Sequence, residues 1–251
     1  IIYLTNDGRR YAAMKDSCLM LQEQGKISDL CMPVKMEKSS EWSFGWEKKL
    51  SGAKLVVARF LNSVTKSDFW ESCMSFMKAN NIPFLLDSVK EDISWGIEPE
   101  IARRLKEYTF YAGRTNFNNF WLYAASLYCD GVESASEPKP ICWAGIYHAG
   151  MEELCMTNLD EYRSKYCRND RPTFGILFYR DEWIWEDLDY IDALTAEAEA
   201  QGYNVIPVFT NQVADTSIGM MTLREVLSSY FMKDGVPVID TVITTMKFSH
   251  T

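Results

Sequence analysis

AKLVVARFL at residues 53–61 is the most strand-like stretch in the first half of the chain. It is almost continuously apolar and rich in β-formers, as expected of a strand buried on both faces of a parallel sheet. Downstream, Phe69, Cys73, Phe76 and Met77 are spaced i, i+4, i+7 and i+8, which predicts a helix with one apolar face. Residues 82–86 form the next apolar run, so a right-handed β-α-β crossover is expected here.

The residues before this strand follow the same alternation. An apolar run at 1–5 ends in Asn6-Asp7-Gly8, a turn that can cap the predicted helix over 10–24, and Gly25 closes that helix. A second short strand is expected at 29–34. Residues 99–128 are predicted to be helical with a break near Gly113, and Thr115 is the expected N-cap of the second piece.

The stretch GVESASEPKP at 131–140 is small, polar and Pro-containing, which is typical of a linker. The alternation of strands and helices then restarts. We expect extended segments at 143–148, 171–180 (RPTFGILFYR), 204–210 and 240–245, and amphipathic helices around 191–201 and 221–233.

This alternation predicts an α/β protein made of two flavodoxin-like units, each a doubly wound parallel sheet. The first unit spans 1–130 and ends in helices, 131–140 is the linker, and 141–251 is the second unit. Apart from the short extended segment at 143–148, the second unit shows about three of the roughly five strands such a sheet usually has. Because the chain also lacks an initiator Met, we expect a fragment with an incomplete second unit.

Composition narrows the possible partners and the compartment. A net charge of -9 argues against nucleic acid as a partner, since phosphate binding needs a basic surface. No apolar run approaches the roughly 20 residues of a membrane span, and no signal peptide is evident. The seven cysteines are odd in number and have no CxxC spacing, which predicts free thiols in a reducing cytoplasm rather than a disulfide framework. With two histidines, an imidazole metal site within the chain is not expected.

The sequence contains none of the common short catalytic motifs. The sequence has no GxxxxGK[ST] or GxGxxG phosphate loop, no GxSxG elbow, no HExxH and no EF-hand loop. A Ser-His-Asp triad stays open, but nothing marks an activated serine. No catalytic residue is assigned, and no cofactor is expected in this chain.

Polar residues that follow the predicted strands are the best candidates for binding, because open α/β sheets bind ligands at the carboxyl ends of their strands. Arg180 can fork onto a carboxylate there, or form a surface ion pair with Asp181 or Glu182. His148 is a ligand contact or a capping or core histidine. Further strand-end residues are Asn6, Asp7, Asn62, Ser63, Tyr179, Thr210, Asn211, Lys247 and Ser249. Trp183 and Trp185 offer a flat stacking surface for a macrocycle, or pack in a core.

Taken in order, the stretches AKLVVARFL, TNFNNFWLYAASL, CWAGIYHAG and RPTFGILFYR, with IDALTAEAEAQGYNVIPVF after them, resemble the CobN/BchH/ChlH family. These are the large subunits of cobaltochelatase and magnesium chelatase, and the resemblance runs from about Gly52 to Ser249. The chain departs from the family pattern in two places. Ala149 replaces the proline that follows the motif histidine, and the acidic DEWIWEDLD follows the FYR motif.

The resemblance implies an N-terminal region of the subunit that binds a tetrapyrrole, either a corrin precursor or a porphyrin. The metal, Co²⁺ or Mg²⁺, is a substrate, and partner ATPase-associated subunits hydrolyse ATP. Carried over residue by residue, the substrate-binding candidates are Asn116, Asn119, His148, Tyr179 and Arg180. The residues usually credited with chelation lie beyond this fragment, so the chain alone is expected to be inactive.

Two alternatives to an enzyme part remain. The two units can form a non-catalytic head that docks the ATPase subunits or gates the cavity, with residues 183–189 as the contact surface. A weaker alternative is a free-standing flavodoxin-like or periplasmic-binding-like sensor, whose flavin form would be yellow.

Overall fold

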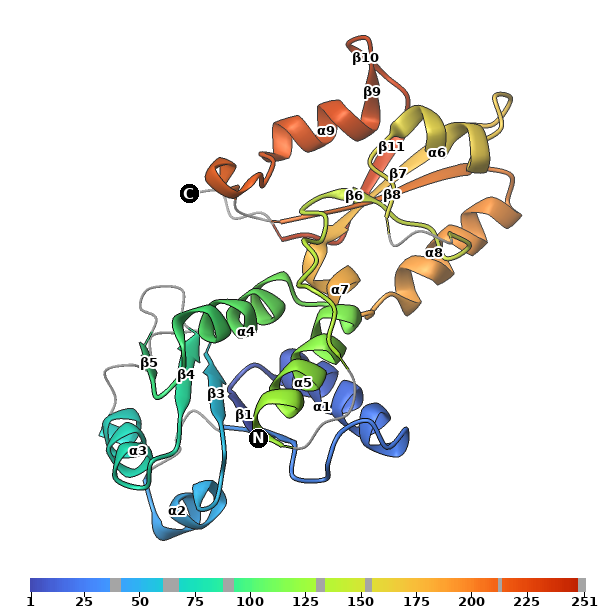
Figure 1. The fold of residues 1–251 in the computed structure, drawn as a ribbon. Helices are drawn as coiled ribbons and strands as arrows, with labels where there is room; N and C mark the ends of the chain where they lie inside the picture. Colours follow the sequence, from blue (N-terminus) through green and yellow to red (C-terminus); the bar gives the residue numbers. More distant parts are fainter. Residues whose placement is uncertain are drawn as a thin grey trace. The chain divides into compact units, whose positions relative to one another are not determined.

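The computed structural model describes residues 1–36, 42–60, 68–87, 93–129, 134–151, 155–211 and 214–247. The chain splits into two compact units, Ile1–Ile141 and Cys142–Thr251. Each unit combines parallel strands with helices, so the chain is a mixed α/β protein (Figure 1). No helix in these ranges is both long enough and apolar enough to cross a membrane.

The first unit is built on a five-stranded sheet in the order β2-β1-β3-β4-β5. Its strands are β1 (Ile2–Thr5), β2 (Met32–Lys35), β3 (Val56–Arg59), β4 (Phe84–Asp87) and β5 (Ile93–Trp95). β1 to β4 are parallel, and β5 pairs antiparallel with β4. The predicted strand at 53–61 contains β3, whose first three residues are buried as expected of a central strand.

Helices cover both faces of this sheet. They are α1 (Gly8–Glu23), α2 (Phe44–Leu50), α3 (Asp68–Ala79), α4 (Pro99–Tyr111) and α5 (Arg114–Tyr128). α2 and α3 form one hydrophobic core with alternate residues of β1, β3 and β4. On the opposite face, the Tyr3 ring lies 5.5 Å from Phe120 and 6.4 Å from Trp121 of α5. Trp121 also donates a hydrogen bond to the Met14 carbonyl, which fixes α5 beside α1.

The ends of the helices show where local prediction was right and where it was wrong. Asp7 caps α1 by accepting hydrogen bonds from the amides of Arg9 and Arg10, as expected. The prediction that Thr115 caps the second helical piece is wrong, because Gly113 is the N-cap of α5. Gly113 has φ 79°, a backbone conformation that glycine adopts without steric cost, so the chain turns two residues earlier.

The second unit has a four-stranded sheet in the order β11-β7-β8-β6. Its strands are β6 (Gly145–Ile146), β7 (Thr173–Tyr179), β8 (Asn204–Thr210) and β11 (Thr241–Thr244), and a separate hairpin joins β9 (Met232–Lys233) to β10 (Val236–Pro237). β11, β7 and β8 are parallel, whereas β6 is antiparallel to β8. Both sheets therefore carry one antiparallel edge strand, which corrects the prediction of wholly parallel sheets; the flavodoxin-like assignment stays a prediction.

Helices of the second unit also lie on two faces. They are α6 (Leu159–Tyr166), α7 (Arg180–Ile184), α8 (Asp189–Ala200) and α9 (Leu223–Phe231), with a 3₁₀ turn at Thr216–Ile218. α6 and α9 form a core with Leu177, Ile206 and Val208. α8 lies on the other face, over Phe174 and Val205.

The unit boundary at Ile141 places most of the predicted linker with the first unit. Residues 131–133 of that linker lie outside the described residues. Residues 134–141 have no helix or strand, yet they are bound to α4 and α5 by the contacts given below. We call residues 134–141 the strap.

Candidate functional site

The carboxyl edge of the second sheet holds the strongest candidate. β7 ends at Tyr179 and α7 begins at the next residue, so Arg180 lies where the strand turns into a helix. The Glu182 carboxylate accepts a hydrogen bond from the Tyr179 amide at 3.2 Å, and a second from the Tyr190 hydroxyl at 2.6 Å. These bonds fix the direction in which Arg180 leaves the sheet.

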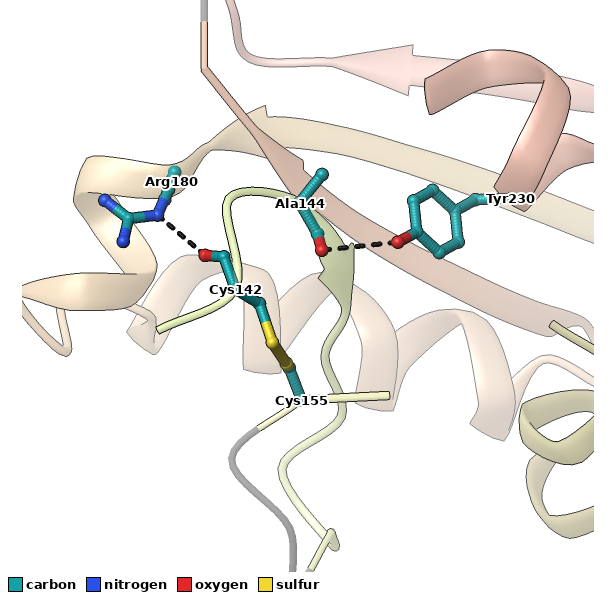
Figure 2. Close-up of a disulfide and its surroundings, with 5 residues drawn as sticks. All are labelled: Cys142, Ala144, Cys155, Arg180 and Tyr230. Carbon is teal, nitrogen blue, oxygen red and sulfur yellow. Dashed lines mark hydrogen bonds between the residues drawn. A yellow bond between two sulfur atoms is a disulfide. The ribbon is translucent and has the colours of Figure 1, made fainter. Parts of the chain in front are cut away.

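Arg180 is a buried cation. Its side chain is 5% exposed, and its Nε donates a hydrogen bond of 2.8 Å to the Cys142 carbonyl (Figure 2). The guanidinium carbon lies 4.2 Å from the centroid of the Trp143 ring, a cation–π contact. Burial lowers the pKa of Arg180 to about 10, partly offset by the neighbouring Asp181, and the side chain stays protonated at neutral pH.

One nitrogen of the Arg180 guanidinium is unsatisfied. Nη2 of Arg180 is buried and has no hydrogen-bond partner among the described residues. A buried donor without an acceptor costs free energy, and a charged one costs more, so an added acceptor at Nη2 would be stabilising. Because Nη2 belongs to a cation, the acceptor that suits it best is a carboxylate or another anion.

The floor beside Arg180 is aromatic and closed. Trp183 stacks on Phe209 with ring centroids 4.1 Å apart and is 8% exposed, so it belongs to the core and offers no open stacking surface. Asn211 donates a hydrogen bond to the Trp143 carbonyl at 3.2 Å. This bond fixes the Trp143 backbone, while the Trp143 ring faces the guanidinium of Arg180.

Tyr179 is engaged at the same edge. Its hydroxyl accepts a hydrogen bond from the Lys247 amide at 2.8 Å. The polar strand-end residues Tyr179, Arg180, Asn211 and Lys247 therefore belong to one edge, as the strand pattern predicted. Asn62, Ser63 and Ser249, which were predicted in the same way, lie outside the described residues.

Cys142 and Cys155 are joined as a disulfide, which corrects the prediction of free thiols throughout (Figure 2). The Ile146 and Met156 backbones exchange two hydrogen bonds of 2.8 and 2.9 Å, which folds the chain back and brings the two cysteines together. The other five cysteines are free: Cys18, Cys31, Cys73, Cys129 and Cys167. The disulfide closes the loop whose first residue supplies the carbonyl that binds Arg180.

His148 lies toward the opposite end of the sheet from Arg180. β6 is antiparallel, so Gly145 pairs with Phe209 and the Tyr147 amide already bonds the Pro207 carbonyl, nearer the start of β8. Nδ1 of His148 accepts a hydrogen bond from the Gly150 amide, and Nε2 contacts the Glu199 carboxylate at 3.1 Å.

These two bonds determine the state of the imidazole. A ring nitrogen that accepts carries no proton, so the proton of His148 is on Nε2 and is donated to Glu199. The ring also stacks on Tyr166, with centroids 4.5 Å apart. Both nitrogens are therefore used within the protein, and a substrate contact would require the Gly150 turn to open.

Asn116 and Asn119 hold the strap. The Asn116 amide accepts from the Lys139 backbone amide and donates to the Lys139 carbonyl, both at 2.9 Å, and it is buried. Asn119 accepts a hydrogen bond from the Ser136 amide at 2.7 Å. Substrate contact by these two residues stays a prediction, while their role in fastening the strap is seen directly.

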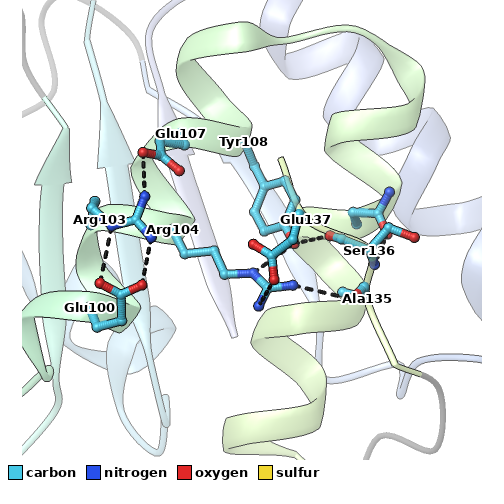
Figure 3. A network of polar contacts seen from close by, with 9 residues as sticks. Glu100, Arg103, Arg104, Glu107, Tyr108, Ala135, Ser136 and Glu137 are labelled. Carbon is cyan, nitrogen blue, oxygen red and sulfur yellow. Dashed lines mark hydrogen bonds and ion pairs between the residues drawn. The ribbon is translucent and has the colours of Figure 1, made fainter. Parts of the chain in front are cut away.

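α4 supplies the other half of this fastening (Figure 3). Arg104 donates to the Ala135 carbonyl at 3.1 Å and pairs with the Glu137 carboxylate at 2.8 Å. The Tyr108 hydroxyl donates to the Ser136 carbonyl. Nearby, Arg103 of α4 pairs with carboxylates of its own helix. The predicted linker is thus a bound segment, because its backbone is satisfied by side chains that lie about 20 to 30 residues away in sequence.

A charged cluster at the carboxyl edge of the first sheet was missed from sequence. Arg59 ends β3 and pairs at 2.5 Å with Asp87, which ends β4 and is 2% exposed. Thr109 donates to the same carboxylate, and Arg10 donates to the Thr109 carbonyl at 2.7 Å. The sequence feature that could have revealed this cluster is that Arg59 and Asp87 are each the last residue of an apolar strand. Asp87 is paired and hydrogen-bonded within the unit, so removing one of its partners would leave a buried charge and destabilise the fold.

A resident metal is not indicated in the described part of the chain. Among those residues, no group of three or more His, Cys, Asp or Glu side chains is arranged to hold a metal ion. At the edge that holds Arg180, a buried cation beside an aromatic ring is suited to recognise an anion.

Comparisons with known proteins agree on one family. Residues 106–251 match the family described as CobN/Magnesium Chelatase. An uncharacterized protein of Methanocaldococcus jannaschii is 28% identical over 154 residues, which cover 61% of this chain and 12% of that protein. Aerobic cobaltochelatase subunit CobN of Sinorhizobium sp. is 30% identical over 146 residues, which cover 53% of this chain and 11% of that protein.

A solved structure shows the same fold. The catalytic subunit of cobaltochelatase from Mycobacterium tuberculosis superposes with a TM-score of 0.61 at 16% identity, over 97% of this chain and 18% of that chain. The chain spans only about a tenth of the length of the curated relatives it matches. The family match covers more than half of the sequence, and the chain therefore belongs to the CobN/magnesium chelatase family.

Proposed function

We propose that this chain is part of the tetrapyrrole-binding large subunit of an ATP-dependent cobalt or magnesium chelatase. In this proposal it forms one wall of the cavity in which a divalent metal, Co²⁺ or Mg²⁺, is inserted into a corrin precursor or porphyrin. Family membership supports the reaction type. We also propose a cytoplasmic location, which the five free cysteines favour and the Cys142–Cys155 disulfide does not.

The observation that carries the proposal is the unsatisfied Nη2 of Arg180. A tetrapyrrole substrate carries carboxylate side chains at its periphery, and one of them would give Nη2 its acceptor once the residues that cover this buried nitrogen move aside. The Trp143 ring would hold the guanidinium plane, while the Cys142 carbonyl keeps Nε occupied. A base that takes the pyrrole protons and ligands that strip water from the metal are expected elsewhere in the subunit.

The experiment compares Arg180→Met with Arg103→Met in the full-length subunit, and measures the Kd of a free-acid porphyrin by fluorescence quenching. A charge-assisted hydrogen bond is worth about 1.5–3 kcal/mol, so Arg180→Met should weaken binding roughly 10- to 150-fold. Arg103 is an exposed arginine, and its variant should bind normally.

A porphyrin methyl ester separates the carboxylate from the ring. Wild type should bind the ester about as weakly as Arg180→Met binds the acid, and Arg180→Met should not distinguish ester from acid. Equal binding of the free acid by wild type and Arg180→Met would refute the role of Arg180.

A second candidate is a head module that docks the ATPase subunits or gates the cavity. It is favoured by exposed acidic residues after α7, Glu186, Asp187 and Asp189. A pull-down of the ATPase subunits with Asp187→Lys/Asp189→Lys tests it. At low salt, the double variant should capture less of the ATPase subunits than wild type does. Unchanged capture would count against this candidate.

A further inference from the structure

The face of the second sheet that carries α8 has an apolar groove beside that helix. The groove has a volume of about 240 Å³ and lies between α8 and the β7–β11 side of the sheet. Its floor includes Phe174 and Ile176 of β7, and its walls include Leu194 of α8 and Ile243 of β11. Leu194 and Ile243 are 40% and 41% exposed, so two large apolar side chains face the groove without full cover.

The first unit contains the same arrangement of strands. Its order β2-β1-β3 places the second, first and third parallel strands side by side, and β8-β7-β11 repeats that order among the parallel strands of the second sheet. The registers agree as well. Tyr3 of β1 pairs with Pro33 and Val57, and Ile176 of β7 pairs with Pro207 and Ile243.

In the first unit the corresponding face is covered. α1 and α5 lie there together, and the Phe120 and Trp121 rings pack on Tyr3. Val57, which is the counterpart of Ile243, is fully buried. α8 occupies the place of α1, because α1 lies between the parallel strands β1 and β2 and α8 lies between the parallel strands β7 and β8. In the described part of the second unit no helix takes the place of α5.

We propose that this groove is the docking site of an amphipathic helix that belongs to the same polypeptide and lies outside residues 1–251. The curated relatives are about eight to ten times longer than the aligned part of the chain, so the family's polypeptide has ample sequence to supply it. Like α5, the helix would present large apolar side chains at i, i+3 and i+4, as Phe117, Phe120 and Trp121 do.

This helix would complete the cover of the face that α8 covers in part, as parallel strands buried on both faces require. The inference does not depend on what the protein binds at Arg180. A chelatase, a docking head and an unrelated function would all leave the same groove to be filled.

The test measures cysteine reactivity in the full-length protein. Leu194→Cys and Ile243→Cys place a thiol in the groove, and Ala196→Cys is the control, an exposed position on the same helix that does not line the groove. Each variant is pulsed with a maleimide, and peptide mass spectrometry gives the rate at that site relative to the urea-unfolded protein.

We expect Leu194→Cys and Ile243→Cys to react at least tenfold more slowly than Ala196→Cys, at all protein concentrations. Equal rates at the three positions would overturn the proposal, because the groove would then be open. Protection that disappears on dilution would also overturn it, since a second copy of the protein would be the occupant.

Discussion

The guanidinium of Arg180 is held in a setting that disfavours its charge. Its pKa is lowered to about 10, so burial costs the folded state on the order of 3 kcal/mol while the side chain is protonated. Because the folded-state pKa lies below that of an exposed arginine, this cost applies in full at every pH below about 10. It shrinks only as the pH rises above that value.

We therefore expect Arg180→Met to be at least as stable as wild type, by up to about 2 kcal/mol after the lost bond to the Cys142 carbonyl is counted. Urea unfolding at several pH values between 6 and 9 should give the same difference, because the cost is constant in that range. If Arg180→Met instead loses about 2 kcal/mol or more of unfolding free energy, then Arg180 stabilises the fold, which would count against a ligand-binding role. Arg103→Met, at an exposed position, serves as the control.

At the scale of elements, the strap is held by Asn116 and Asn119 of α5, the two residues that the sequence predicted to bind substrate. Asn116 satisfies both the amide and the carbonyl of Lys139 in a buried position. Asn116→Ala removes these two part-buried bonds, and we expect a loss of about 1–3 kcal/mol in the unfolding free energy. Asn119→Ala removes one partly exposed bond to Ser136 and should cost no more than about 1 kcal/mol.

Hydrogen exchange of residues 134–141 checks this directly. The amide of Lys139 should exchange faster in Asn116→Ala than in Asn119→Ala, relative to wild type. If both variants leave the exchange of Lys139 unchanged, then the strap is held by Arg104 and Tyr108 alone.

A second element-scale prediction concerns the contact between α9 and β7. A Cβ atom at Gly175 would lie 2.9 Å from the Phe231 ring, which is itself 3% exposed and has little room to move. Gly175→Ala should therefore lose about 1–3 kcal/mol by overpacking, and Phe231→Leu should recover part of that loss in the double variant. Gly8→Ala, where no atom lies within 4 Å of the added Cβ, is the control for a change at glycine. Additive effects of Gly175→Ala and Phe231→Leu in urea unfolding would contradict this contact.

The sequence predicted the elements that long apolar runs encode and missed those that depend on distant contacts. β3 and β7 were predicted because buried parallel strands are continuously apolar. β5 and α7, of three and five residues, are too short to show a period. The placement of His148 away from Arg180 follows from the antiparallel direction of β6, which a two-residue strand does not reveal.

The position of the candidate site was predictable from the sequence, but the burial of Arg180 was not. Tyr179 and Arg180 follow an apolar run, and this places them at the ligand-binding edge of an α/β sheet. The burial of Arg180, however, comes from Trp143, a residue 37 positions earlier whose ring covers the guanidinium. The Cys142–Cys155 pair was missed for a related reason, since the Ile146–Met156 bridge creates it.

For the whole molecule, the two units differ in how completely their sheets are covered. The first unit has helices on both faces and nine described residues of its core cluster that are fully buried: Leu4, Leu50, Val56, Ala58, Trp70, Cys73, Met77, Phe84 and Leu86. We expect residues 1–141 to fold without the second unit. Denaturant unfolding of that shorter chain, followed by Trp fluorescence, should be cooperative. A gradual change, or a chain that exchanges all its amides rapidly, would show that the first unit depends on the rest of the protein.

β11 gives the isolated chain a further property. It is the outer strand of the described second sheet, all four of its residues are exposed, and it pairs with β7 on one side only. The sequence of the strand, TVIT, carries no charge, proline or bulge to discourage another strand from adding to its free edge. Produced without the rest of the polypeptide, the 251-residue chain is therefore prone to aggregate through this edge, and a lysine in place of Val242 is the simplest change that would keep it monomeric.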